Sequence, residues 1–77
     1  MIRLYPNPSD GSIYISSGQE AIIRKIWIED LQGQVKGIVE TGGQNPLTVI
    51  LPEAEGMYLV RMDTGKGYVI RKMVKIK

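Results

Sequence analysis

The sequence predicts an all-β domain built as a small antiparallel sandwich or barrel. Turn-forming residues recur every several positions along the 77-residue chain, and short apolar runs fill the intervals between them. The composition supports a packed domain, because 43% of the residues are hydrophobic and 23% are charged, as in globular proteins. This length allows one domain, and we expect residues 1–77 to form a single one.

Residues 4–11 form a stiff segment, LYPNPSDG, that precedes the first clear strand. Pro6 and Pro8 fix φ and remove two backbone donors, so a strand ladder cannot simply continue through them. They also bias the residues before them towards extended conformations. We expect residues 4–5 to form a short first strand, and residues 7–11 to turn the chain into a strand over 12–16.

The next segment, AIIRKIWIEDLQ, is compatible with a helix or a strand. Five apolar residues would line one face of a helix: Ile22, Ile23, Ile26, Trp27 and Leu31. Ile28 would then fall on the polar side, and four isoleucines with a tryptophan favour a strand. We predict a strand over 22–30 and a hairpin turn over 30–33, with Gly33 in the left-handed conformation.

Four more strands complete a set of about seven, and we place them at residues 35–39, 48–51, 57–62 and 68–76. In the run GMYLVRMD, Tyr58 and Val60 point to one face while Leu59 and Arg61 point to the other. The last strand differs, because each of its faces mixes apolar and basic residues. It is therefore expected at the edge of a sheet, or with its end projecting beyond the sheet.

Positive charge is concentrated at the end of the chain. Residues 61–77 contain six of the ten basic residues and a single acidic one, Asp63. Lysines on a strand edge commonly prevent edge-to-edge pairing. The alternative, which is more specific, is a docking surface for an anionic partner. An exposed edge strand would also permit a weak dimer.

Enzyme chemistry is disfavoured by the residues that are missing. The chain has no histidine and no cysteine, which removes the commonest general base and metal ligand as well as any disulfide. Gly65-Lys66-Gly67 lacks the remainder of a phosphate loop and is expected to be a hairpin turn. Glu53 and Glu55 are expected to be solvated loop carboxylates. We therefore expect no catalytic residues, no metal site and no cofactor.

The five aromatic residues are scattered over different runs, so we expect most of them at core or half-buried strand positions. Trp27 should point outward with Lys25 and Glu29 if its isoleucine neighbours face the core. Such a tryptophan either packs against residues of neighbouring strands or serves as an anchor for a partner. Binding to nucleic acid is not expected, because the basic residues lack interleaved aromatic ones.

Four motifs, in order and spanning nearly the whole chain, closely resemble the C-terminal sorting domain of the type IX (Por) secretion system, type A. They are Tyr5-Pro6-Asn7-Pro8, then Ile26, Ile28, Asp30 and Gly33, then Gly56, Tyr58 and Val60, and finally Lys72, Met73, Val74 and Lys75. The resemblance implies a small immunoglobulin-like antiparallel β-sandwich of about seven strands.

The resemblance also implies a function. The domain would be the C-terminal secretion signal of a larger exported protein, with its cargo on the N-terminal side. It would pass through the periplasm and direct the cargo through an outer-membrane translocon to the cell surface or the extracellular space. Shuttle and sortase proteins of the type IX system would be further partners, and the sortase would cleave upstream of Leu4. The alternative is an accessory β-sandwich, a carbohydrate-binding or spacer module of a secreted enzyme.

Recognition is expected at the last strand, which could pair with a receptor by strand addition. Four basic residues would steer that contact: Arg71, Lys72, Lys75 and Lys77. Gly56 and Tyr58 match the family motif, but we expect them to be structural, as a turn residue and a core residue.

Overall fold

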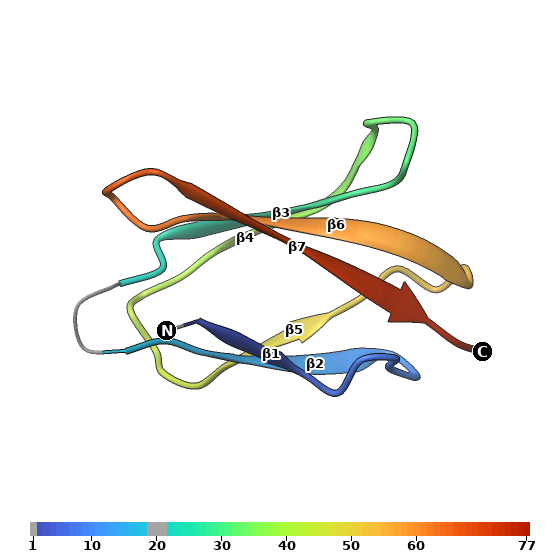
Figure 1. The fold of residues 1–77 in the computed structure, drawn as a ribbon, viewed down its shortest axis with the longest axis horizontal. Helices are drawn as coiled ribbons and strands as arrows, with labels where there is room; N and C mark the ends of the chain where they lie inside the picture. Colours follow the sequence, from blue (N-terminus) through green and yellow to red (C-terminus); the bar gives the residue numbers. More distant parts are fainter. Residues whose placement is uncertain (1, 19–21) are drawn as a thin grey trace.

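The computed structural model describes residues 2–18 and 22–77. These residues form seven strands: β1 (Arg3–Tyr5), β2 (Ser12–Ser16), β3 (Lys25–Glu29), β4 (Val35–Glu40), β5 (Leu47–Ile50), β6 (Gly56–Asp63) and β7 (Tyr68–Lys75). The strands make a three-stranded sheet of order β1-β2-β5 and a four-stranded sheet of order β4-β3-β6-β7, and every pair within them is antiparallel. The two sheets lie one above the other (Figure 1), so the fold is a β-sandwich.

The predicted all-β class and the strand assignment are confirmed, including β3, whose sequence also allowed a helix. β3 is shorter than the predicted 22–30, because pairing on both sides is regular only between Lys25 and Glu29. Ile23 precedes the strand yet is buried. The register with β4 shifts between Ile28 and Glu29, directly before the turn.

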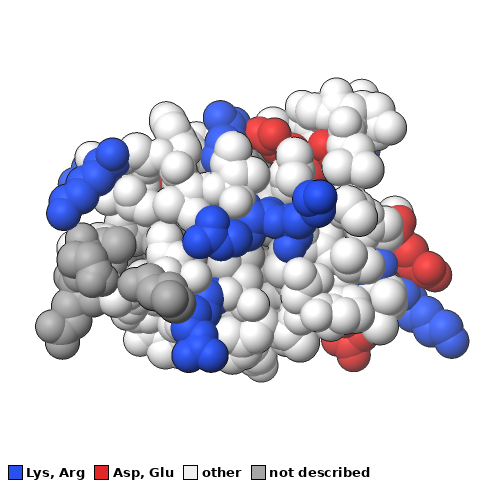
Figure 2. All heavy atoms as spheres, viewed as in Figure 1, with Lys and Arg blue, Asp and Glu red and all other residues white. Residues whose placement is uncertain are grey.

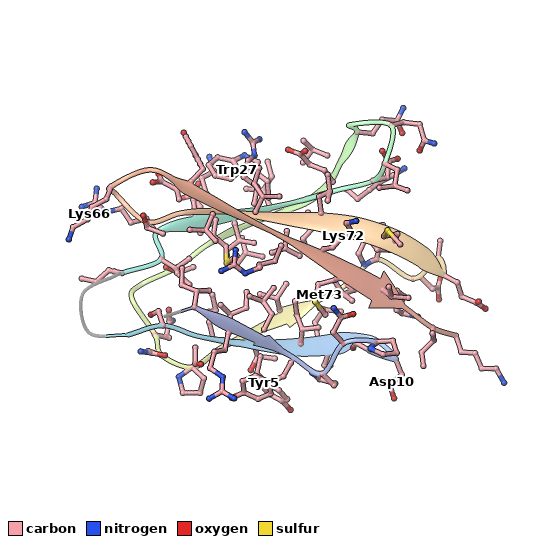
Figure 3. The ribbon with its side chains drawn as sticks, in the orientation of Figure 1. Tyr5, Asp10, Trp27, Lys66, Lys72 and Met73 are labelled. Carbon is pink, nitrogen blue, oxygen red and sulfur yellow. The ribbon has the colours of Figure 1, made fainter. Side chains whose placement is uncertain are left out.

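The core is formed by the inward residues of both sheets, which alternate with exposed ones as a strand requires. It consists of Ile13, Ile15, Ile23, Ile26, Ile28, Leu47, Val49, Leu51, Tyr58, Val60, Met62 and Met73. Met73 reaches this core from β7 and lies between the two layers (Figure 3). Because β2, β3 and β6 each contribute at least two fully buried side chains, the centre of the sandwich is assembled from strands far apart in sequence.

The aromatic residues depart from expectation, since only one of the five, Tyr58, is buried. Trp27 is half-buried, while Tyr5, Tyr14 and Tyr68 are exposed. The reason is register: isoleucine, valine and methionine occupy the inward positions, so these aromatic residues fall on outer faces. There they pack against one another, as in the Tyr5–Tyr14 pair, whose ring centroids are 5.7 Å apart.

Two turns follow the predicted chemistry. Asp30 accepts hydrogen bonds at Oδ1 from the amides of Gln32 and Gln34, both at 2.9 Å, and Gly33 has the predicted left-handed φ of 86°. The Gly65-Lys66-Gly67 run lies in the β6–β7 hairpin loop, where the Thr64 amide donates to the Gly67 carbonyl at 3.0 Å. It is a hairpin turn, as expected, and not a phosphate loop.

Tyr58 adds a feature of immunoglobulin-like sandwiches. It lies near the start of β6 with its ring in the core, and its hydroxyl donates to the Ala54 carbonyl at 2.7 Å. A tyrosine that bonds back to the backbone a few residues upstream is the tyrosine corner of such folds. Gly56 precedes it with a φ of 147°, a conformation that other residues rarely adopt. Tyr58 is thus buried in the core, and Gly56 is the first residue of β6.

No helix able to cross a membrane is present in the described residues.

We predict that Ile26→Val lowers the free energy of unfolding by about 1 kcal/mol, because Ile26 is 0% exposed and loses one methylene from the core. The matched control is Ile38→Val on the neighbouring strand, where the side chain is 55% exposed and the expected change is below about 0.5 kcal/mol. Urea denaturation followed by circular dichroism measures both. Equal losses for the two variants would contradict the assigned inward face of β3.

Candidate functional site

β7 is an edge strand, as predicted, and pairs with β6 on one side only. Its register fixes which side chains share a face with their β6 partners: Ile70 lies opposite Arg61, Lys72 opposite Leu59, and Met73 opposite Tyr58. Lys72 lies on the outer side of the four-stranded sheet and Met73 on its inner side (Figure 3). Two of the four sequence motifs meet at the free edge of this strand: the proline-containing segment and β7 itself.

Half of that free edge is covered by the proline-containing segment, Asn7-Pro8-Ser9, which we call the brace. The Asn7 side chain donates from Nδ2 to the Lys72 carbonyl and accepts at Oδ1 from the Val74 amide, both at 3.1 Å. The Ser9 amide donates to the Val74 carbonyl at 2.9 Å, and the Ser9 carbonyl accepts from the Ile76 amide at 2.8 Å. Ser9 thus forms a parallel bridge with Lys75. The brace follows β1 of the three-stranded sheet and pairs with the C-terminal half of the β7 edge.

Ser9 anchors the brace from inside. It is 1% exposed, and its hydroxyl donates to the Ser12 carbonyl at 2.7 Å and accepts from the Gly11 amide at 3.0 Å. With its backbone bonds to β7, Ser9 joins the turn before β2 to the end of the chain. Buried polar groups must be hydrogen-bonded, and here those bonds hold the two ends of the chain together.

No described residue covers the N-terminal half of the β7 edge in this way. Hydrogen-bonding direction alternates along a strand, so the edge-facing residues are Tyr68, Ile70, Lys72 and Val74. Among the described residues, only the Arg71 guanidinium reaches the open part, where Nη1 donates to the Ile70 carbonyl at 3.3 Å. We call the stretch from Tyr68 to Lys72 the open edge.

Positive charge lies on this edge. Figure 2 shows lysine and arginine side chains gathered across the middle of this face, over β7. Arg71 and Lys72 are exposed, and within the described part of the chain neither forms a salt bridge. The free edge of β4, by contrast, carries charges of both signs, Lys36 and Glu40. The open edge therefore carries cations that have no acidic partner among residues 2–18 and 22–77.

Lys75 departs from the expectation that it would steer a partner. It points inward from β7, is 6% exposed, and donates from Nζ to the carbonyls of Glu53 and Ile76 at 3.3 and 3.4 Å. Its ammonium group is used inside the sandwich, because inward positions of β7 lie over the smaller sheet. Lys77 is exposed, so three of the four basic residues expected to steer a partner are exposed: Arg71, Lys72 and Lys77.

The two remaining sequence motifs, the one that ends in Asp30 and Gly33 and the one that begins at Gly56, meet at a second place. The Asp30–Gly33 turn and the start of β6 together border an open hollow of about 220 Å³, lined by Asp30, Leu31, Gln32, Glu55, Gly56, Met57 and Tyr58. Asp30 is occupied in capping its own turn, and Tyr58 in its bond to Ala54. Because of these hydrogen bonds, we assign a structural role to Asp30 and Tyr58.

Trp27 lies on the outer face, as expected, but its ring is not free. The Arg61 guanidinium carbon is 4.6 Å and Lys25 Nζ 5.1 Å from the ring centroid, and the Tyr68 ring is 5.9 Å away, edge-on. Arg61 is held in turn by Glu29, with Nη2 2.8 Å from Oε2. Trp27 therefore serves the cross-strand packing of the outer face.

Ser9 is the residue of this site that sequence reasoning missed. The turn over 7–11 was predicted, but nothing local indicates that it pairs with residues more than sixty positions away. A serine between a proline and an Asp-Gly pair signals a turn and no more. The alternation of apolar and basic residues in β7 did locate the edge that Ser9 binds.

A model of the family described as the secretion system C-terminal sorting domain matches residues 3–77. No curated protein and no solved structure matches the chain at a significant level. The matched range contains both the brace and the open edge.

We predict that Ser9→Ala lowers the free energy of unfolding by about 1–3 kcal/mol, because it leaves the Gly11 amide and the Ser12 carbonyl without their partner. Ser16→Ala on β2 is the control, since the Ser16 hydroxyl makes no hydrogen bond with the described residues. Urea denaturation compares the two variants. A loss for Ser9→Ala no larger than for Ser16→Ala would show that the buried hydroxyl does not anchor the brace.

Proposed function

The chain belongs to the secretion system C-terminal sorting domain family, and we propose that it acts through the open edge of β7, to which type IX machinery adds a strand. Membership makes the domain a C-terminal type IX sorting signal, which is not itself catalytic. It also implies interaction with the type IX machinery, a cargo on the N-terminal side, and export to the cell surface or extracellular space.

The observation that carries this proposal is the half-covered edge. Strand addition requires unpaired amide and carbonyl groups in a row, together with side chains that select the partner. The stretch from Tyr68 to Lys72 offers the edge-facing amides of Tyr68, Ile70 and Lys72 and the Tyr68 carbonyl, all without a partner among the described residues. Arg71 and Lys72 supply the selecting side chains. Cations on one edge also raise the rate of encounter with an anionic partner.

The remainder of the route is proposed with it. The domain ends a larger exported protein, crosses the periplasm, and is bound by the outer-membrane translocon and its shuttle proteins. A sortase then cleaves upstream of Leu4. β1 begins at Arg3, so a cleavage site upstream of Leu4 would lie at or before the first strand of the sandwich. The body of the domain, residues 3–77, would be removed as one folded unit.

An accessory carbohydrate-binding module has less support. Trp27 is the aromatic residue that such a site would use, and its ring is already packed against Arg61 and Tyr68. Sugar stacking needs an open aromatic face, so this arrangement favours the sorting role.

We predict that Ile70→Pro reduces export of a fused cargo several-fold. Proline removes an edge-facing amide that β6 does not use, so the β6–β7 ladder persists while the open edge loses a donor. Ile70→Thr is the control, since it removes the same apolar side chain and keeps the amide. Secreted cargo is quantified in a bacterium with a type IX system. If both variants export equally, the edge amide plays no part in recognition.

We also predict that Lys72→Glu lowers export more than Lys72→Gln, because reversal adds repulsion to the loss of attraction. The matched control is Lys66→Glu in the β6–β7 loop, which makes the same change of net charge at a residue outside the open edge. The same export assay ranks the three variants. Equal effects of Lys72→Glu and Lys66→Glu would mean that only net charge matters.

A further inference from the structure

We propose that Asn7 is a specificity-determining residue of the sorting signal: it ends the usable edge of β7 at Lys72 and thereby fixes the register of the partner strand. The partner is an extended segment of the type IX machinery that carries a carboxylate beside Lys72. This inference rests on the proposed function, in which the machinery pairs with β7.

The brace copies the hydrogen bonding of a parallel strand. A residue in such a strand donates its amide to one carbonyl and accepts from the amide two positions further along. Ser9 does this with its backbone, bonding Val74 and Ile76 around Lys75. The Asn7 side-chain amide does the same one step earlier, bonding the Lys72 carbonyl and the Val74 amide around Met73. Asn7 and Ser9 are two consecutive rungs of a ladder beside β7.

A partner strand must stop where these rungs begin. The Lys72 carbonyl and the Val74 amide are already paired, so a segment continuing past Lys72 would have to displace the Asn7 amide. The groups left for it are the amide and carbonyl of Tyr68 and the amides of Ile70 and Lys72. The Ile70 carbonyl accepts a hydrogen bond from Arg71 Nη1 at 3.3 Å, and it becomes available to the partner when that side chain moves.

The side chains along the open edge define the chemistry of the partner. Tyr68 and Ile70 are 61% and 54% exposed on the outer face, so an apolar partner residue gains burial beside them. Arg71 and Lys72 follow with no acidic group of the described residues paired to either. Opposite charges on neighbouring strands are favourable and like charges are not. The matching segment is thus apolar at one end and acidic at the end that meets the brace.

A photo-crosslinking amino acid at position 70, or at position 74, tests this in a fused cargo during export. Both side chains lie on the outer face, where an added strand would be their neighbour. We expect a crosslink to a type IX component from position 70 and none from position 74. In an Asn7→Ala background the position 74 crosslink should appear. The crosslinked peptide, identified by mass spectrometry, should contain Asp or Glu.

The outcomes separate the two proposals. Normal export with no crosslink from either position overturns strand addition at β7, and the proposed mechanism with it. Crosslinks from positions 70 and 74 alike in the Asn7-containing domain overturn the role of Asn7 and leave strand addition standing. The inference also fails if position 74 gives no crosslink in the Asn7→Ala background, or if the crosslinked peptide lacks acidic residues.

Asn7→Ala must remain folded for this comparison. The two Ser9 backbone bonds to β7 and both Ser9 hydroxyl bonds do not involve the Asn7 side chain, so the brace keeps its anchor. Circular dichroism of the variant checks the fold. Asn7→Asp is a second variant that keeps the acceptor for the Val74 amide but loses the donor to Lys72, and it should expose position 74 only in part.

Discussion

The hydrogen bonding between Asn7-Pro8-Ser9 and the end of β7 is the constraint on which the rest of the structure depends. It joins groups 65 to 67 residues apart in the sequence and links the start of the three-stranded sheet to the outermost strand of the four-stranded one. β7 has a single strand neighbour, β6, and a domain of 77 residues has little core to spare. The brace gives β7 a second partner, and so keeps Met73 between the sheets.

The same contact divides the edge into two functional parts. An exposed strand edge tends to pair with other chains, and natural proteins limit that hazard by covering the edge or by placing charge on it. Here the C-terminal half is covered and the N-terminal half is charged. Covering the whole edge would leave nothing for a partner, whereas leaving it all exposed would favour non-specific association. A stable domain and a defined recognition segment therefore arise from one strand.

Much of this could be predicted from the sequence because it is local. Turn spacing and short apolar runs located most strands, the prolines placed the first one, and the isoleucines with Trp27 decided between helix and strand for β3. Asp30 and Gly33 specified their turn, and mixed faces identified β7 as an edge strand. The brace could not be predicted, because its partners are distant in sequence and because one of its own contacts is made by the Asn7 side-chain amide in place of backbone groups. Lys75 was misjudged for a related reason: whether a lysine on a mixed face is buried depends on which sheet lies beneath it. The covering of Trp27 depends on Arg61, which faces it only once the β3–β6 register is known.

Amide hydrogen exchange along β7 in the unmodified domain, resolved residue by residue by NMR, tests the central claim most directly. The brace protects the amides of Val74 and Ile76, whereas the edge-facing amides of Ile70 and Lys72 lack a hydrogen-bond partner among the described residues. The account predicts slow exchange at Val74 and Ile76 and exchange near the unprotected rate at Ile70 and Lys72. Rapid exchange at Val74 and Ile76, or equal protection along the whole strand, would contradict it.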